Sequence, residues 1–472
     1  MVKIMLRFII SLWVSKLCLF FFKLTGKEKD DRPGILALRL CDDFIDRVKK
    51  PRLVIAVTGT NGKTTISNLV SDILKLEGKR VAYNNWGANY KAGQARCLLD
   101  AVNIFNRPTK DAAVVEVDEL LSYQTLPWIK PDYIIVTNIC RDSIRRNAHQ
   151  EYIFNSINKG LALVPKTKLI LNADDPVSSF LGERYGGVGE EDAKLPNKRI
   201  YFSIADQKQE SLPTNVSDFP VCPKCGTKPE FLYKHYRDIG KFRCPKCGLA
   251  SKKPKYIGTA IDYGERTICV SEAGKKESCY PLVSDTIFNA FNVVAIIALF
   301  RELGLSSKKL AENISRIKIP ESRMAFEECG GIKIATFTAK GQNVSAASTV
   351  FGYIAAESQD KELILLLDEH YGDDKAIETI TWLYESDFEN LNQPSIKKII
   401  VAGHRYLDYR LRLKLAGIPE EKVVCVRDEN TIPEYVEFDG IDSIYILHDV
   451  YTVSRAKNIK EKIKERMLNN ER

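Results

Sequence analysis

One short glycine-rich loop constrains the fold of this chain more than any other feature. An apolar run at residues 53–57 precedes it, an amphipathic stretch at 66–77 follows it, and its seven residues are Gly59, Thr60, Asn61, Gly62, Lys63, Thr64 and Thr65. Strand, glycine-rich turn and helix in this order let backbone N–H groups and a helix N-terminus surround phosphate oxygens. Lys63 adds a point charge, and the Thr64 hydroxyl suits Mg²⁺. The loop therefore predicts nucleotide binding in an α/β domain, but it does not define the reaction.

Length and charge set broad limits. The chain has 472 residues, which is enough for two or three domains. Its net charge of +9 is modest for this length, and no block of like charge indicates a nucleic-acid-binding tail. Of the twelve cysteines, four form paired C-x-x-C motifs and the others are scattered, unlike a disulfide-rich secreted domain. A large nucleotide-binding chain with free thiols is expected in the cytoplasm.

Apolar runs alternate with helical stretches after the loop. They lie at residues 80–83, 113–117, 133–137, 168–171 and 199–203. This alternation predicts a mostly parallel sheet with helices on both faces, and helices at 287–303 and 308–317 close the domain. Because ligands gather at the carboxyl ends of such strands, Glu116, Asn138 and Asn172 are candidate site residues.

A second, smaller α/β domain is predicted after Pro320. Apolar runs recur there at residues 332–337, 363–367, 398–402 and 443–447. The predicted boundaries are 1–47 for an apolar helix and lead-in, 48–319 for the central domain and 320–472 for the C-terminal domain. Residues 205–280 break the alternation and are interpreted as an insertion.

Two C-x-x-C motifs lie within this insertion. They consist of Cys222, Cys225, Cys244 and Cys247, with 18 residues between the pairs. Each pair is followed by glycine, and the spacing is typical of a zinc ribbon with four thiolate ligands. Four ligands leave no open position for catalysis, so a structural zinc site is predicted at about residues 218–255. The aromatic residues of this segment could form a small core or bind nucleic acid; they are Phe219, Phe231, Tyr233, Tyr236 and Phe242.

The first residues are strongly apolar. Residues 4–22 carry only Arg7 and Lys16 as charges, and at 100° per residue these two lie on opposite sides of a helix. No small-residue cleavage site follows the apolar stretch, which argues against a signal peptide. The sequence predicts a helix that either packs on the body of the protein or contacts the inner face of the membrane.

Several motifs together resemble the Mur ligases, which join amino acids or amines to carboxylates in cell-wall synthesis. The short loop, with Val57 in place of the first glycine of the general motif, resembles their ATP loop. The resemblance implies a central ATP-binding domain and a smaller, Rossmann-like C-terminal domain. It assigns Mg²⁺ to Thr64 and Glu116, and it makes Lys63 and Glu116 catalytic.

Further site residues follow only from that resemblance. Asn289 and Asn292 match an N-x-x-N motif that lies against the adenine, although both could simply be helix N-cap residues. Arg323 matches a linker arginine that contacts ATP phosphate. Residues 172–176 match a turn after a strand, where Asx side chains often only cap backbone groups.

A more specific resemblance is to the MurT-type branch of this family. It shares the apolar first segment, the ribbon, the acidic run at 116–119 and the stretch at 403–417. This resemblance implies that ATP phosphorylates the α-carboxyl of D-glutamate in lipid II and that ammonia then displaces phosphate. The implied partners are a GatD-type class I glutaminase, as a heterodimer, and lipid II at the membrane surface; nucleic acid is not expected. The implied cofactors are ATP, Mg²⁺ and Zn²⁺.

The chain also departs from the family. Ser143 stands in place of a histidine, Arg145 in place of an acid, and Thr379 where an aspartate is expected to assist amidation. Asp373 or Glu378 is the candidate catalytic substitute. Two alternatives stay open: a nucleotide-binding regulatory module with a zinc ribbon, and a Mur-type ligase with a different amine or acceptor. The first fifty residues leave no room for the UDP-binding domain of ligases that act on UDP-linked precursors.

Overall fold

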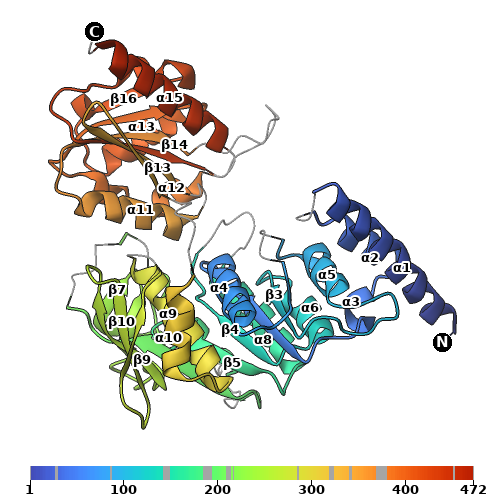
Figure 1. Cartoon of the computed structure of the whole chain (residues 1–472). Helices are drawn as coiled ribbons and strands as arrows, with labels where there is room; N and C mark the ends of the chain where they lie inside the picture. Colours follow the sequence, from blue (N-terminus) through green and yellow to red (C-terminus); the bar gives the residue numbers. More distant parts are fainter. Residues whose placement is uncertain are drawn as a thin grey trace. The chain divides into compact units, whose positions relative to one another are not determined.

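The chain folds into two compact units. The computed structural model describes residues 2–26, 30–84, 88–141, 149–183, 194–208, 214–215, 217–283, 286–317, 324–339, 343–367, 380–449 and 452–470. The first unit comprises Met1–Cys140, His149–Ser211 and Asp218–Ile319, and the second comprises Arg141–Ala148, Leu212–Ser217 and Pro320–Arg472. Each unit is built around its own sheet (Figure 1).

The first unit contains a nine-stranded sheet of order β11-β10-β9-β6-β5-β4-β1-β3-β2. Neighbouring strands in the part β9-β6-β5-β4-β1-β3-β2 of this order are parallel to each other. Strands β10 and β11 add an antiparallel edge. The central strands are continuous apolar runs because both of their faces are covered. The strands are β1 (Leu53–Thr58), β2 (Val81–Tyr83), β3 (Ala112–Glu116), β4 (Tyr133–Val136), β5 (Lys168–Asn172), β6 (Arg199–Ile204), β9 (Tyr256–Asp262), β10 (Thr267–Glu272) and β11 (Ser278–Pro281).

Helices build a separate core on each face of this sheet. Alternate residues of β1 divide between them: Val54 and Ala56 join one core, and Ile55 and Val57 join the other. The first core includes residues of α1 (Val2–Leu24), α2 (Arg32–Leu40), α3 (Phe44–Arg47), α5 (Lys91–Asp100), α6 (Ser122–Ile129), α8 (Gln150–Ala162) and η1 (Ser178–Phe180). The second includes residues of α4 (Lys63–Leu76), α9 (Ile287–Glu302) and α10 (Ser307–Ser315).

The interpretation of residues 205–280 as an insertion is wrong in its second half. Strands β9, β10 and β11 extend the main sheet, and Tyr256, Ile268 and Tyr280 are buried in its second core. Only the hairpin of β7 (Glu230–Tyr236) and β8 (Ile239–Arg243), together with its cysteine loops, forms a separate two-stranded sheet. The alternation of buried and more exposed residues in β10 is the usual sign of a strand with one buried face.

The expectation that all cysteines outside the paired motifs are free thiols also needs correction. Cys269 on β10 and Cys279 on β11 stand directly opposite each other in the antiparallel pair and form a disulfide. Their separation of only ten residues in sequence is explained by the tight hairpin between the two strands.

The second unit contains a six-stranded sheet of order β12-β13-β17-β14-β15-β16, parallel except for the β12–β13 pair. Its strands are β12 (Met324–Cys329), β13 (Ile332–Thr338), β14 (Lys361–Leu366), β15 (Ile396–Ala402), β16 (Val423–Val426) and β17 (Ser443–His448). One core contains residues of α11 (Val344–Ala356), α12 (Thr381–Glu385), η2 (Phe388–Leu391) and α13 (Tyr406–Leu415). The other contains residues of α14 (Ile432–Tyr435) and α15 (Val453–Asn470); η3 (Glu420–Lys422) and η4 (Glu429–Thr431) are short turns.

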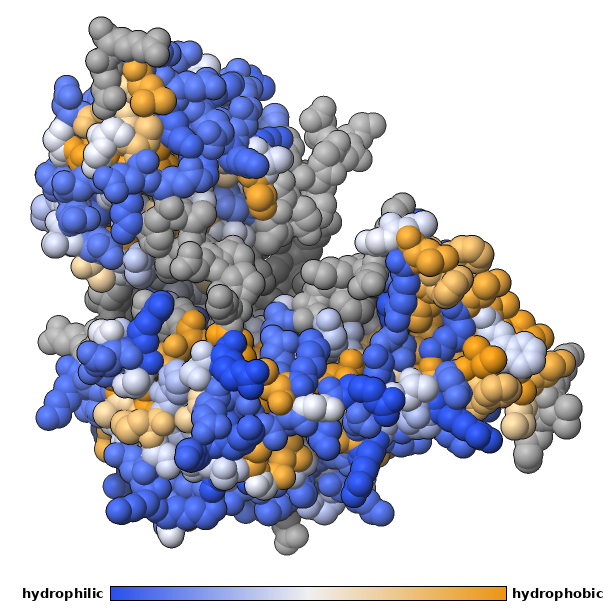
Figure 2. All heavy atoms as spheres, in the orientation of Figure 1, coloured by the Kyte–Doolittle hydropathy of each residue, from blue (hydrophilic) through white to orange (hydrophobic). Residues whose placement is uncertain are grey.

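The predicted N-terminal helix packs on the body of the first unit along one side only. Phe8, Leu12 and Leu19 of α1 are buried, and Ser11 donates a hydrogen bond to the Ala37 carbonyl on α2. The other side leaves large apolar side chains exposed, and they colour the visible face of α1 orange in Figure 2. By length and composition, residues 5–24 could cross a membrane, and 28% of the most apolar window is buried.

Candidate nucleotide site and cysteine cluster

The glycine-rich loop is held in shape by the segment that follows β4. The Thr60 N–H donates to the Asn138 carbonyl at 2.8 Å, and the Asn61 N–H donates to Asn138 Oδ1 at 3.1 Å. Gly59 has φ +121°, and a Cβ there would lie 2.3 Å from Thr137 Oγ1. Only glycine fits such a position, so the loop packs directly against the carboxyl end of β4.

Lys63 begins α4 and pairs with a buried carboxylate. Its Nζ donates to Glu119 at 3.0 Å and 3.2 Å and also to the carbonyls of Gly59 and Thr60. Glu119 is 2% exposed, and burial raises its pKa although Lys63 opposes the shift. The sequence interpretation singled out Glu116 and missed this partner; the acidic run at 116–119 is the signal that could have found it.

Thr64 and Glu116 come together as predicted for a Mg²⁺ site. The Thr64 hydroxyl donates to both carboxylate oxygens of Glu116, at 3.1 Å and 3.2 Å. The backbone N–H of Glu116 donates to Asn84 Oδ1 at 2.8 Å, which fixes the end of β3. Hydroxyl and carboxylate oxygens are hard ligands, so this pair could hold a Mg²⁺ ion. Thr65 lies in the same first turn of α4 and is partly exposed.

The acidic run at residues 116–119 is buried. Glu116, Asp118 and Glu119 are 2%, 7% and 2% exposed. Asp118 Oδ1 accepts a hydrogen bond from the Leu120 N–H at 3.0 Å, which shapes the turn after the strand. The run is therefore part of the interior of the site.

The capping interpretation of residues 172–176 agrees with the structure. Asp174 Oδ2 accepts from the Ile204 N–H, and Asp175 Oδ2 accepts from the Ile139 N–H, both at 2.8 Å. Burial raises the pKa of Asp174 to about 7 and that of Asp175 to about 6. These aspartates join the carboxyl ends of β4, β5 and β6.

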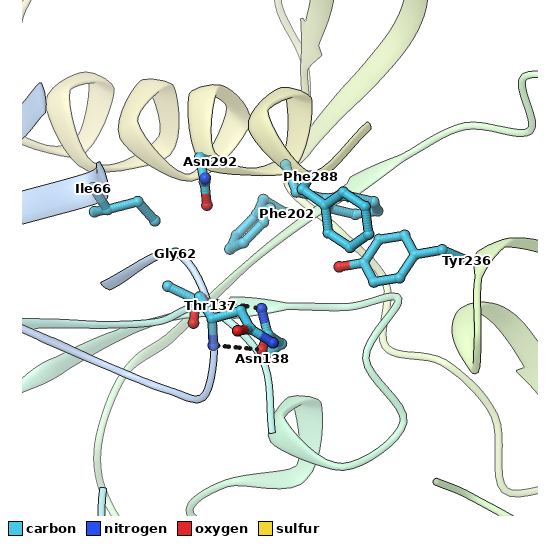
Figure 3. A pocket seen from close by; sticks show the side chains of 10 residues that line it. Gly62, Ile66, Thr137, Asn138, Phe202, Tyr236, Phe288 and Asn292 are labelled. Atoms are coloured by element: carbon cyan, nitrogen blue, oxygen red, sulfur yellow. Dashed lines mark hydrogen bonds between the residues drawn. The ribbon is translucent and has the colours of Figure 1, made fainter. Parts of the chain in front are cut away.

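A pocket opens beside the loop. Aromatic rings and amide side chains dominate its lining, which is formed by Asn61, Gly62, Ile66, Thr137, Asn138, Phe202, Tyr236, Phe288, Phe291 and Asn292. Figure 3 shows the Asn292 side chain pointing from α9 toward the loop at Gly62. The aromatic rings of Phe202, Phe288 and Tyr236 lie on the side of the pocket away from Gly62. Apolar walls with a few polar groups are typical of small-ligand pockets, and this one suits a flat heteroaromatic base.

The two asparagines of α9 are not helix caps. Thr286 is the N-cap, and its hydroxyl accepts hydrogen bonds from the backbone and the side chain of Asn289. Asn292 donates to Asn289 Oδ1 at 3.3 Å, and its own Oδ1 would lie 2.7 Å from a Cβ at Gly62. Of the two, Asn292 lines the pocket.

Several predicted residues lie outside the part of the chain that the structure describes. They are Arg323, Asp373, Glu378 and the departures at Ser143, Arg145 and Thr379. Their predicted roles therefore stay predictions.

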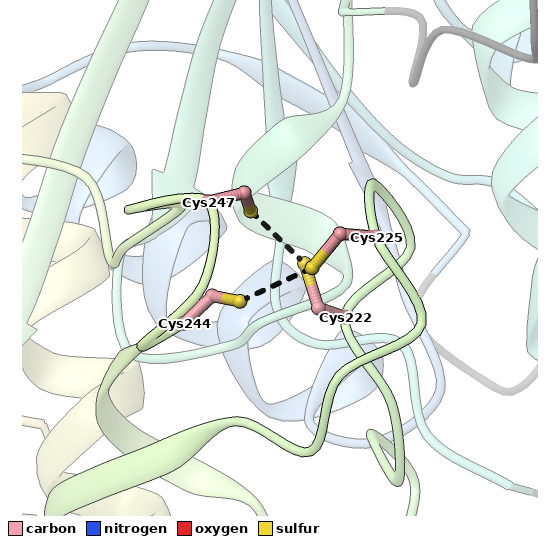
Figure 4. Close-up of side chains that lie close together, drawn as sticks. All are labelled: Cys222, Cys225, Cys244 and Cys247. Atoms are coloured by element: carbon pink, nitrogen blue, oxygen red, sulfur yellow. Dashed lines mark hydrogen bonds between the residues drawn. The ribbon is translucent and has the colours of Figure 1, made fainter.

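The four paired cysteines converge at the base of the β7–β8 hairpin (Figure 4). Their sulfur atoms all lie within 4.8 Å of one another, and the Cys222–Cys247 and Cys225–Cys244 pairs approach to 3.5 Å and 3.4 Å. A tetrahedral zinc with Zn–S bonds of about 2.3 Å needs sulfur atoms slightly under 4 Å apart. The donor set and its spacing therefore fit zinc.

The ribbon aromatics pack within the chain. The Phe242 ring lies 4.9 Å from Phe219 and 6.1 Å from Phe231, and the Tyr233 hydroxyl donates to the Ile204 carbonyl. Tyr236 lies 4.1 Å from Phe288 on α9. These contacts favour the structural role over a surface for nucleic acid.

Comparison with known proteins defines the class. Residues 57–211 match the Mur ligase middle domain, and residues 341–453 match the MurT ligase C-terminal domain. The chain is 28% identical over 426 residues to the lipid II isoglutaminyl synthase (glutamine-hydrolyzing) subunit MurT of Staphylococcus aureus, covering 89% of this chain and 90% of that one. It is 26% identical over 419 residues to the same subunit of Streptococcus pneumoniae, covering 88% of each.

Solved structures support the same fold. A pseudomurein peptide ligase type C from Methanothermus fervidus matches 89% of this chain and 81% of its own, with a TM-score of 0.62 and 20% identity. MurF from Acinetobacter baumannii matches 91% of this chain and 80% of its own, with a TM-score of 0.61 and 14% identity. The chain carries a Mur ligase middle domain, and the matches together indicate an ATP-dependent ligase. Its C-terminal domain is of the MurT type.

Proposed function

We propose that this chain amidates the α-carboxyl group of D-glutamate in lipid II, giving D-isoglutamine during peptidoglycan synthesis. The observation that carries the proposal is the similarity to MurT subunits along nine tenths of the chain. The carboxylate attacks the γ-phosphorus of ATP, which forms an acyl phosphate and releases ADP. Ammonia then attacks the acyl carbon, phosphate leaves with the bonding electron pair, and the nitrogen loses a proton.

The residues around the loop supply what phosphoryl transfer needs. Lys63 and the loop N–H groups stabilise charge on the transferring phosphoryl group, which is the main requirement of this chemistry. Lys63 leaves Glu119 to do so. The part of the pocket between Asn292 and Phe288 holds the adenine, and the hydrogen bond from Asn292 to Asn289 positions the Asn292 side chain. Arg323 is proposed as a further phosphate contact.

Magnesium and zinc have separate proposed roles. Thr64 and Glu116 hold the Mg²⁺, which when bound neutralises phosphate charge. Cys222, Cys225, Cys244 and Cys247 hold a structural zinc ion. Asp373 or Glu378 is proposed to assist attack by ammonia.

The ammonia source is proposed to be a GatD-type class I glutaminase that forms a heterodimer with this chain. Support comes from the similarity to proteins that are named as subunits of a glutamine-hydrolyzing synthase. The proposed location is the cytoplasm, at the inner face of the plasma membrane. The exposed apolar side of α1, which includes Trp13, Leu17 and Phe20, supports a position beside a lipid-linked substrate.

Reconstitution tests the proposal. The purified chain and a GatD-type glutaminase are incubated with lipid II, ATP and glutamine, and the lipid product is analysed by mass spectrometry. Amidated lipid II is expected only when both proteins, ATP and glutamine are present. If ATP binds but no amidated product forms with either glutamine or ammonium chloride, the assigned reaction is wrong.

A Mur-type ligase with a different amine or acceptor is the second candidate. It is favoured by the sequence departures at Ser143, Arg145 and Thr379. The same assay distinguishes it, because ADP would form with another amine or another carboxylate acceptor while lipid II and ammonia leave ATP intact.

A further inference from the structure

The ribbon hairpin connects the cysteine cluster to the pocket beside the loop. Cys225 precedes β7 and Cys244 follows β8, so the cluster closes the open end of the hairpin. The opposite end is the turn at residues 236–239, and Tyr236 at this turn lines the pocket together with Gly62 and Asn292. One short hairpin therefore links the predicted metal site with the predicted nucleotide site.

Tyr236 forms an aromatic wall of the pocket. Its ring lies 4.1 Å from Phe288 and 6.0 Å from Phe291, both on α9. Figure 3 shows its hydroxyl directed into the pocket, which Asn138 also lines. The aromatic ring comes from the ribbon, whereas the loop and α9 belong to the central domain.

The hairpin is fastened to the carboxyl ends of the sheet strands. The Gly240 N–H donates to the Asp174 carbonyl at 2.8 Å, and the Ile204 carbonyl accepts from Tyr233 and lies 3.0 Å from His235 Nε2. A Cβ at Gly240 would lie 2.2 Å from the Tyr233 carbonyl oxygen, so the two strands approach as closely as glycine allows. The position of Tyr236 is thus set by the hairpin.

The turn itself is also tightly held. Arg237 has φ +47°, which is rare for a bulky residue, and its guanidinium pairs with Asp218 at 3.1 Å. Asp238 accepts from the Phe219 N–H at 2.9 Å, next to the ring packing around Phe242. Disorder in the packing of Phe219 and Phe242 would therefore remove contacts that fix the turn that carries Tyr236.

We propose that Tyr236 is a base-recognition residue and that the ordered ribbon, closed at its cysteine cluster, sets the affinity and base selectivity of the pocket for adenine nucleotides. This rests on the proposed function, in that residues 59–65 bind the phosphates of ATP. A ring that stacks on a base typically strengthens binding by about ten-fold or more. Loss of the ring should weaken the binding of the base and leave the binding of phosphate unchanged.

The first experiment measures nucleotide affinity of the full-length protein. Tyr236→Leu should weaken ATP binding roughly ten-fold and reduce the ratio of ATP affinity to GTP affinity. Tyr236→Phe should have the wild-type values of both quantities, because the aromatic ring is kept. Inorganic tripolyphosphate should bind equally well to all variants. Leu232→Ala is the matched control, since Leu232 is 64% exposed on the same strand and should leave every value unchanged.

The second experiment follows the metal. Zinc content is measured by a colorimetric chelator, and ATP affinity is measured for the protein as purified, after chelation and after zinc is returned. Chelation and Cys225→Ser should each weaken ATP binding about as much as Tyr236→Leu, and returning zinc should restore binding only with Cys225 intact. Chelation should have no further effect on Tyr236→Leu.

The outcomes separate this inference from the proposed function. If the wild type binds neither ATP nor tripolyphosphate, both fail. If Lys63→Ala abolishes ATP binding while Tyr236→Leu retains wild-type affinity and base preference, the proposed nucleotide site stands and the role of Tyr236 is refuted. If chelation removes zinc without changing ATP affinity, the coupling between cluster and pocket is refuted.

Discussion

Replacing Gly62 by alanine should damage the nucleotide site through two effects that can be separated. Gly62 has φ +88° at the N-cap of α4. The first effect is backbone strain, because an L-residue in this left-handed region costs roughly 1–2 kcal/mol. The second is a collision, because the new Cβ would lie 2.7 Å from Asn292 Oδ1.

The magnitude follows from these two effects. Asn292 is 8% exposed and bonded to Asn289, so it can move only by leaving its preferred rotamer, which costs roughly 0.5–1.5 kcal/mol. The total loss in unfolding free energy should be about 1.5–3.5 kcal/mol. ATP affinity should fall by about ten-fold or more, since Asn292 is displaced and the methyl group fills pocket space.

Gly78 provides the matched control at the other end of the same helix. It has φ +73°, and a Cβ there would meet nothing within 4 Å. Gly78→Ala should therefore cost only the strain of roughly 1–2 kcal/mol and leave ATP affinity unchanged. Urea unfolding gives the stability difference, and calorimetric titration with ATP gives the affinity. Equal destabilisation by both substitutions, with ATP affinity intact in each, would refute the assignment of Gly62 and Asn292 to the pocket.

Three further predictions concern buried polar groups. Lys63→Ala should abolish ADP formation and also destabilise the protein, because Glu119 loses its buried partner; adding Glu119→Gln should recover stability but not activity, and an active single variant would exclude this loop as the ATP site. Asp174 binds its proton more tightly when folded, with a pKa of about 7 against 3.8, so its contribution to the unfolding free energy should be greatest below pH 4 and fall as pH rises toward 7. Asp174→Asn keeps the acceptor for the Ile204 N–H and should flatten this slope by up to about 1.4 kcal/mol per pH unit in urea titrations between pH 4.5 and 7.5; an unchanged slope would contradict the burial argument. Arg412→Lys should cost roughly 2–4 kcal/mol in the second unit, because Arg412 donates to the Leu383 and Ser386 carbonyls in a fork that lysine cannot reproduce; unaltered urea unfolding of that unit would contradict this.

Local patterns in the sequence predicted much of the first sheet. The runs at 53–57, 133–137 and 168–171 became β1, β4 and β5, because a strand covered on both faces must be apolar throughout. The pairing of Thr64 with Glu116 could also be predicted, since loop and strand end meet at the same edge of a parallel sheet.

Other features depend on contacts between distant residues. Tyr236 packs against Phe288, and no periodic pattern in the sequence relates the two segments that carry these rings. The pairing of Lys63 with Glu119 depends on the path of the turn after β3. The capping interpretation of Asn289 was wrong because Thr286, three residues earlier, takes the N-cap position. Strand β12 (Met324–Cys329) was missed because its sequence carries two adjacent glutamates that do not read as an apolar run.

The ion pair between Lys63 and Glu119 has a consequence for proton balance. Without nucleotide, the positive charge of Lys63 opposes the rise in the pKa of Glu119 that burial causes. When Lys63 turns to a phosphate, Glu119 loses the cation that favoured its charged form, and its pKa rises further. Nucleotide binding should then take up a proton from solution. The enthalpy of ATP binding should therefore vary with the ionisation heat of the buffer, and ATP affinity should weaken as the solution becomes more alkaline.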